Sequence, residues 1–274
     1  MKNIVVPIDF TKQSVTALEN AIHMAERLEM GIILMHSLEL PAGFSTSPVV
    51  GANYQNLHVQ RDAAQERLHD LIKEVAIDSN MNCTTKVTYG NLSHAIKRIT
   101  EEHEIGLVVM ASSGKSGFLE NLTGSQSYNV AKHVDCPVVV LPEEAKIMSM
   151  KHIALAGDYS EAYDPSVFEQ LINIAKHFFS HIHVVHVADE AALEDEQIDI
   201  AKSLHLYLKD VSHSFHFKSY DQVKDGLIDF CVQNQVDLLA MVPRQHGLLD
   251  WFMQSSTTKE LIEDMPLPLM MLQD

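Results

Sequence analysis

Short apolar runs alternate along the whole chain with longer stretches in which apolar residues recur at helical spacing. In the first half these patterns predict strands at 3–9, 31–37, 83–89, 106–111 and 137–141, and helices at 12–29, 58–78, 92–104 and 124–134. Runs without alternating polar residues are typical of strands buried on both faces, so we expect a parallel sheet covered by helices. Right-handed crossovers between such strands give a doubly wound α/β sheet.

The second half repeats the first. Lys2–Thr11 has an echo in Lys151–Ser160, and Met110–Leu141 aligns with Met241–Leu272 without a gap. The second set of strands is predicted at 152–157, 182–187, 213–219, 236–242 and 268–272, with helices at 163–179, 190–210, 222–234 and 254–265. We therefore expect two tandem doubly wound, five-stranded parallel sheets with helices on both faces, in domains 1–144 and 149–274.

Local signals refine this picture at two places. Thr11 precedes the first helical stretch and is a residue type preferred at helix N-caps. The segment Leu40–Asn56 is rich in Pro, Gly and Ser, which predicts a surface loop.

The composition of the chain limits the classes of partner that the protein could bind and the compartment in which we expect it. A formal charge of −17 disfavours nucleic acid and anionic membranes as partners, although a local cradle of amides could still bind a small anion. The apolar run at the N-terminus is too short for a signal peptide, and three cysteines without metal-ligand spacing are typical of reduced thiols. We expect a soluble cytoplasmic protein.

The segment 107–141 carries the most specific chemistry. An apolar strand opens into a loop with Gly114, Gly117 and Gly124, and Ser125 and Gln126 begin a helix. Glycines allow backbone N–H groups to approach an anion, and a helix N-terminus adds partial positive charge. This pattern predicts a phosphate site.

Four segments together resemble the universal stress protein family. The ATP-binding members carry Gly, two residues, Gly, nine residues, then Gly and Ser or Thr; here Ala111 takes the first position, Gly114 the second, and Gly124-Ser125 the last. The remaining matches are the strand end Val6–Phe10, the triplet Met35-His36-Ser37 and the last strand from Cys136-Pro137-Val138. The resemblance covers nearly the whole chain as two tandem domains, and it implies that the strands of each sheet lie in the order 3-2-1-4-5.

The resemblance implies ATP, with Mg²⁺, as the ligand of the first half. It implies that Asp9 bonds the ribose, that Pro7 and Ile8 line the adenine, and that backbone near Ser37 contacts the base. It further implies that Met110, Ala111, Ser112 and Ser113 pass beneath the ribose and phosphates, while Gly114, Gly124, Ser125 and Gln126 donate to the phosphates. Single-domain relatives pair through their last strand, so the two halves could pair within one chain, and a homodimer is also open.

Two departures from the family pattern matter. Ala111 replaces the first glycine, which costs about 1 kcal/mol if that position needs a positive φ and almost nothing if φ is negative. The second half has lost all three glycines, reading Val242-Pro243-Arg244-Gln245 and, nine residues later, Ser255-Ser256. We therefore place the nucleotide in the first half and expect a degenerate site in the second.

The histidines suggest a second hypothesis. His181 and His183 lie on one face of a predicted strand, and His213 and His216 begin the next, so the four could converge on a metal. No carboxylate or cysteine has matching spacing, so we assign no metal and regard these rings as half-exposed strand residues.

The leading hypothesis is a tandem universal stress protein, an ATP-binding regulatory module that acts in stress response through protein partners. We expect no enzyme activity beyond slow, incidental ATP hydrolysis, because no catalytic set of side chains can be assigned. A nucleotide-free scaffold, or a binder of another small ligand, is the alternative. A third possibility is an adenine-nucleotide-dependent enzyme that resembles the ATP pyrophosphatases, but this chain lacks the S-G-G-x-D-S phosphate loop of that group.

Overall fold

A computed structural model describes most of the chain. The described residues are 1–39, 50–75, 81–112, 126–143, 145, 147, 149–157, 159, 161–188, 193–243 and 267–273, with side chains from 56 onward in the second of these ranges. The predicted helix 254–265 lies outside them.

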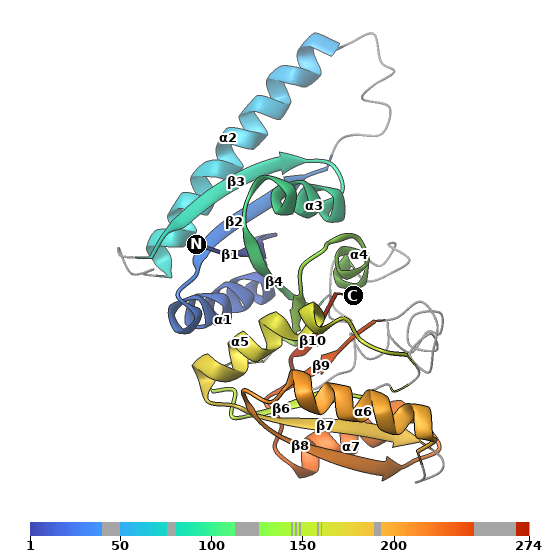
Figure 1. Cartoon of the computed structure of the whole chain (residues 1–274). Coiled ribbons are helices and arrows are strands. Elements are labelled where there is room, and N and C mark those ends of the chain that lie inside the picture. Colours follow the sequence, from blue (N-terminus) through green and yellow to red (C-terminus); the bar gives the residue numbers. More distant parts are fainter. Residues whose placement is uncertain are drawn as a thin grey trace.

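Ten strands form a single sheet (Figure 1). They are β1 (Asn3–Pro7), β2 (Gly31–Leu38), β3 (Cys83–Tyr89), β4 (Ile105–Ala111), β5 (Val138–Leu141), β6 (His152–Ala156), β7 (His181–Ala188), β8 (Ser212–Ser219), β9 (Leu238–Met241) and β10 (Leu269–Met271). The order across the sheet is β3-β2-β1-β4-β5-β10-β9-β6-β7-β8, so each half has the predicted order 3-2-1-4-5.

The last strands of the two halves pair with each other and thereby connect the two half-sheets. β5 and β10 run antiparallel with Val140 opposite Leu269, whereas every other neighbouring pair is parallel. The intramolecular pairing expected from the family resemblance therefore occurs. The two predicted five-stranded sheets are continuous, and each half covers the edge that the other would otherwise expose.

Helices cover both faces of the sheet (Figure 1). The helical elements are α1 (Lys12–Leu28), α2 (Val50–Glu74), α3 (Leu92–Glu102), α4 (Gln126–His133), a 3₁₀ turn (Pro165–Phe168), α5 (Glu169–Phe178), α6 (Asp195–Tyr207) and α7 (Val223–Gln233). Buried residues of α1, α2, α5 and α6 belong to one apolar cluster, and those of α3, α4 and α7 belong to a second. The sheet is thus sandwiched between two helical layers, as predicted. No helix in the described ranges is long and apolar enough to cross a membrane.

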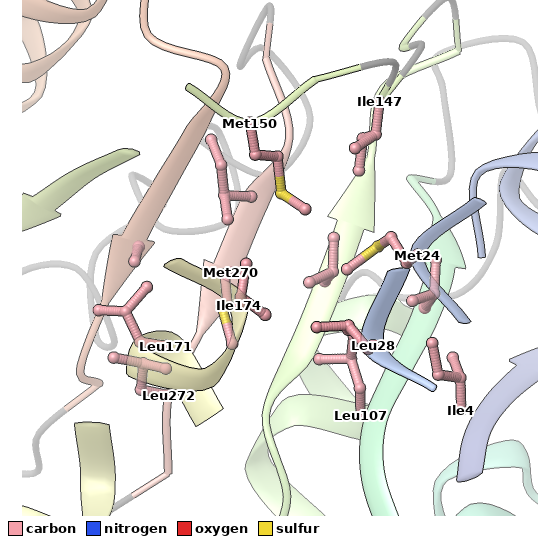
Figure 2. Close-up of a cluster of buried hydrophobic side chains, with 14 of the residues drawn as sticks. Ile4, Met24, Leu28, Leu107, Ile147, Met150, Leu171, Ile174, Met270 and Leu272 are labelled. Atoms are coloured by element: carbon pink, nitrogen blue, oxygen red, sulfur yellow. The ribbon is translucent and has the colours of Figure 1, made fainter. Parts of the chain in front are cut away.

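The first cluster runs through both halves of the chain. Figure 2 shows Met24 and Leu28 of α1 in the same group as Leu171 and Ile174 of α5 and Met270 of β10. Met24, Leu171, Ile174 and Met270 are fully buried. The predicted domains 1–144 and 149–274 therefore share one continuous apolar core.

The segment that joins the halves is anchored on α1. The buried side chain of Asn20 donates from Nδ2 to the carbonyl of Ala145 at 3.0 Å and accepts the N–H of Ile147 at Oδ1 at 2.5 Å. Ile147 and Met150 are buried in the first cluster. The connection is thus packed against the core.

Several element boundaries differ from prediction. Thr11 caps α1 as expected, accepting the N–H of Ser14, but α2 begins at Val50, so the predicted loop Leu40–Asn56 is helical in its last part. The single helix predicted at 163–179 is a 3₁₀ turn followed by α5. Pro165 begins that turn, and the Asp164 side chain caps it by accepting the N–H of Ser166.

Candidate functional site

The carboxyl ends of β1, β2 and β4 meet where the winding of the first half reverses. β1 lies between β2 and β4 in the sheet, and its backbone continues the pairing beyond Pro7, because the N–H of Ile8 donates to Met35 O at 2.8 Å. Pro7 and Ile8 are buried, whereas Asp9 is exposed. Ligands of open α/β sheets bind at this kind of position.

The Asp9 carboxylate is held in one orientation. Its Oδ1 accepts the Thr11 N–H at 2.9 Å and the Thr11 hydroxyl at 2.6 Å. Partial burial acts to raise the pKa of Asp9, but the hydrogen bonds from Thr11, with a further one from Ser14, outweigh it and lower the pKa below its usual value. Asp9 is therefore ionised at neutral pH and presents a fixed acceptor.

Phe10 forms a turn that sequence reasoning did not single out. Its φ of 65° is left-handed, a strained conformation for an aromatic residue. Its ring contacts His36, with centroids 4.8 Å apart, and the Arg67 guanidinium carbon lies 3.8 Å from the ring centroid. His36 Nδ1 lies 2.6 Å from Ile8 O. No motif spacing predicts Arg67, because the rotation of α2 against the sheet brings it here.

The end of β2 is tied to the loop after β3. The Ser37 hydroxyl donates to Gly90 O at 2.6 Å, and the Gly90 N–H donates to Leu38 O at 2.9 Å. Gly90 has a φ of 95°, which a side chain would strain. Since Pro7, the last residue of β1, pairs with Met35, Ser37 lies two residues beyond that pair along β2.

The backbone at the end of β4 shows whether alanine is strained at position 111, where the family pattern has its first glycine. Ala111 is the last residue of β4, pairs with Leu141 and is not among the residues with positive φ. The missing glycine therefore costs no backbone strain. Met110 is buried, and the Ser112 N–H donates to Leu141 O at 2.8 Å. α4 runs from Gln126 to His133, within the predicted helix 124–134, and the buried Ser127 hydroxyl donates to Ala111 O at 3.4 Å.

The phosphate loop itself lies outside the described residues. Ser113, Gly114, Gly124 and Ser125 belong to that segment, so their roles stay predictions. The structure brings the following predicted site residues to one edge of the sheet: Pro7, Ile8, Asp9, Ser37, Met110, Ala111 and Ser112.

The equivalent edge of the second half is packed differently. Tyr159, the counterpart of Phe10, is 1% exposed and stacks on His186 with centroids 4.7 Å apart. Gly157 takes the place of Ile8, and a Cβ there would lie 3.1 Å from Tyr159 Oη. The tyrosine ring therefore occupies the space that a side chain at 157 would need. Asp158 and the segment 244–256 lie outside the described residues.

The histidine prediction is correct in part. His181, His183 and His216 gather on one face of the sheet, whereas His213 lies on the other face beside His205. His152 of β6, which sequence reasoning missed, also belongs to this group. Within the described ranges, no three His, Cys, Asp or Glu side chains are arranged to hold a metal ion.

The fold and the strand ends define a doubly wound α/β protein with two copies of one unit, and the first copy places the exposed carboxylate of Asp9 at its switch point. A model of the universal stress protein family matches residues 1–142, and the chain belongs to that family.

Sequence comparison finds relatives of the length of one unit. The chain is 28% identical over 144 residues to universal stress protein YxiE of Bacillus subtilis, a match that covers 50% of this chain and 97% of that protein. It is 26% identical over 145 residues to a universal stress protein of Methanocaldococcus jannaschii, covering 53% of this chain and 84% of the relative.

Structural comparison finds a likeness along the whole chain. The crystal structure of a universal stress protein from Archaeoglobus fulgidus superimposes with a TM-score of 0.73 and 15% identity, covering 99% of this chain and 96% of that one. At this identity the match demonstrates the common fold.

Proposed function

We propose that the first half binds ATP, with Mg²⁺, and that the chain acts as a nucleotide-responsive regulatory module in stress response. The observation that carries this proposal is the Asp9 carboxylate, exposed at the switch point, ionised and fixed by Thr11. One carboxylate oxygen accepts from Thr11, and the other is the acceptor that we assign to the ribose hydroxyls.

Three further observations support this assignment. Ala111 is extended, so the departure from the glycine pattern does not distort the loop entrance. The Arg67 guanidinium lies near Phe10 and adds positive charge close to Asp9 in a protein of net negative charge. Gly114, Gly124 and Ser125 retain the phosphate-binding pattern in sequence.

The nucleotide belongs to the first half alone in this proposal. Tyr159 fills the corresponding space in the second half, and Pro243 removes a backbone N–H from the loop after β9. We propose that the second half serves as a fixed partner surface. The division into domains 1–144 and 149–274 belongs to the same proposal, as does a role without catalytic turnover.

Calorimetric titration of the purified chain with Mg-ATP tests the proposal, together with mass spectrometry of any nucleotide that copurifies. Asp9→Ala removes a charged acceptor, and a hydrogen bond to a charged group contributes about 1.5–3 kcal/mol, so we expect affinity to fall by about 10- to 150-fold. Asp158→Ala is the matched control at the equivalent position of the second half, and it should bind as the wild type does.

Gly124→Val is the second test, since a side chain in the phosphate loop would block close approach of the anion. Its matched control is Ser255→Ala in the eroded copy. No detectable binding to the wild type at millimolar Mg-ATP would overturn the proposal in favour of the nucleotide-free scaffold. Equal losses from Asp9→Ala and Asp158→Ala would overturn the assignment to the first half.

A further inference from the structure

A continuous chain of imidazoles and hydroxyls crosses the three outer strands of the second half. His152 Nδ1 lies 3.1 Å from His183 Nε2, and His183 Nδ1 lies 3.1 Å from His216 Nε2. The Ser214 hydroxyl lies 2.8 Å from both His216 Nε2 and His181 Nε2. The chain therefore links β6, β7 and β8 through side chains as well as through the backbone ladder.

The strand register explains this arrangement. His152 is opposite His181, and His183 is opposite Ser214, so alternation places all of these side chains on the face that α7 covers. Phe230 of α7 closes the cluster, with its ring centroid 5.7 Å from that of His183 and 4.8 Å from that of His216. The first half has no counterpart, because the positions equivalent to His152, His181 and His183 are occupied by Asn3, Gly31 and Ile33.

Neutral imidazole rings satisfy the hydrogen bonds of this side-chain network, whereas positively charged rings disrupt them. A neutral imidazole has one donor and one acceptor nitrogen, so successive rings can pass hydrogen bonds in one direction. An imidazolium has two donors. If two adjacent rings are protonated, N–H faces N–H across 3.1 Å and two positive charges share a half-buried space.

The charged groups around the rings do not offset this repulsion. On β8, Lys218 Nζ lies 5.7 Å from the Phe230 ring centroid. Asp237, the residue before β9, accepts the backbone N–H of His152 at 2.9 Å. α7 contributes Lys224 and Asp225, together with Asp229, which accepts from Tyr220 and Gln233. Burial raises the pKa of the Cys231 thiol to about 12, so this thiol is neutral. Within the described ranges, no carboxylate is hydrogen-bonded to the rings of His181, His183 or His216.

We propose that this histidine chain is a proton-binding switch: neutral rings hold β6, β7 and β8 together, and protonation of the chain loosens β8, the edge strand of the sheet. The ligand is the proton itself. This function is independent of nucleotide binding, because its residues lie in the half to which we assign no nucleotide.

The direction of the pH effect follows from the pKa values. Burial first, and then the neighbouring rings of His181, His216 and His152, lowers the pKa of His183 from 6.5 to about 4. Burial also lowers the pKa of His181 and of His216, with smaller contributions from His152 and from Lys218 respectively. As the pH falls, these histidines therefore bind protons at a higher pH in the unfolded chain than in the folded chain. The stabilisation is complete above pH 6.5 and is lost between pH 6.5 and pH 4.

Urea denaturation of the full chain, followed by circular dichroism at pH 7.5 and pH 5.0, tests the switch. A His183 pKa of about 4 in the folded chain, against 6.5 in the unfolded chain, would make the equilibrium constant for unfolding roughly 30-fold larger at pH 5.0 than at pH 7.5. Because the ring is half-exposed, screening by solvent reduces this factor to about tenfold. His183→Asn keeps a donor and an acceptor but does not titrate, so it should lose this tenfold sensitivity. His58→Asn, an exposed position on α2, is the matched control and should keep it.

Histidine Hε1 resonances followed by NMR provide a second measurement that does not depend on how well His183→Asn folds. The resonance of His183 in the wild type should titrate well below pH 6. Titration of His183 near pH 6.5, or equal pH sensitivity in wild type and His183→Asn, would overturn the proposal. Strong stabilisation of the wild type by Zn²⁺ at pH 7.5, absent in His183→Asn, would overturn it too, because it would show the rings gathered around a metal.

Discussion

Replacement of Ile174 by alanine tests whether the two halves form one cooperative unit. Ile174 lies on α5, is fully buried and belongs to the cluster that also contains Met24 and Leu28 of α1 (Figure 2). Since α5 belongs to the second half and α1 to the first, a cavity at this position weakens packing on both sides of the junction.

The magnitude follows from the groups removed. Ile→Ala deletes three carbon atoms, and each buried methylene contributes about 0.8 kcal/mol, which gives about 2.4 kcal/mol before the cavity is counted. With a cavity contribution the total reaches about 3–4 kcal/mol, within the range measured for such substitutions. Against a total stability of about 5–15 kcal/mol, this loss is easily measured.

The assay combines urea denaturation with amide hydrogen exchange read separately in β1 and β7. If the shared core couples the halves, protection should fall by the same free energy in both strands. Leu206→Ala on α6, where the side chain is 62% exposed, is the control and should change stability by less than about 0.5 kcal/mol. Loss of protection in β7 with none in β1 would refute the reasoning, because it would show that the halves unfold independently.

Two further substitutions test particular buried polar groups by urea denaturation. Asn20→Ala removes the bonds to Ala145 and Ile147 and leaves a buried N–H without a partner, so we expect a loss of about 1–3 kcal/mol; a change below about 0.5 kcal/mol would show that the junction is not anchored there. Tyr159→Phe removes a buried hydroxyl that has no partner among the described residues, so stability should stay equal or rise by up to about 1 kcal/mol, and a clear loss would reveal a partner.

The positions of the strands along the chain were predictable because the same pattern occurs in both halves, whereas their order across the sheet followed from the family resemblance. Continuous apolar runs mark strands in either copy, and the unit-length match between 110–141 and 241–272 fixes which strands correspond. The pairing of β5 with β10 followed from the family resemblance. The start of α2 was not predictable, since a Pro- and Gly-rich composition biases a segment toward loops although its last residues continue the helix.

The candidate site was predictable only where a residue ends a strand. Asp9 and Ala111 follow directly from apolar runs, so their places at the sheet edge follow from topology. Arg67 and His152 could not be found in this way. Arg67 depends on how α2 rotates against the sheet, and His152 on the register of β6 against β7, and both are set by tertiary packing.

The two copies also differ in packing at the edge to which we assign the nucleotide in the first half. In both halves a histidine near the end of the second strand contacts the carbonyl two residues before an aromatic ring, at 2.6 Å in the first half and 2.8 Å in the second. The rings differ in depth: Phe10 is half-buried, whereas Tyr159 is fully buried above Gly157. Burial of a large aromatic ring stabilises the second half at the expense of space for a ligand. Loss of the loop glycines is therefore only part of the change. Restoring glycines at 242, 245 and 255 would leave the tyrosine in place, so the loop and the ring must change together before the second edge could admit a nucleobase.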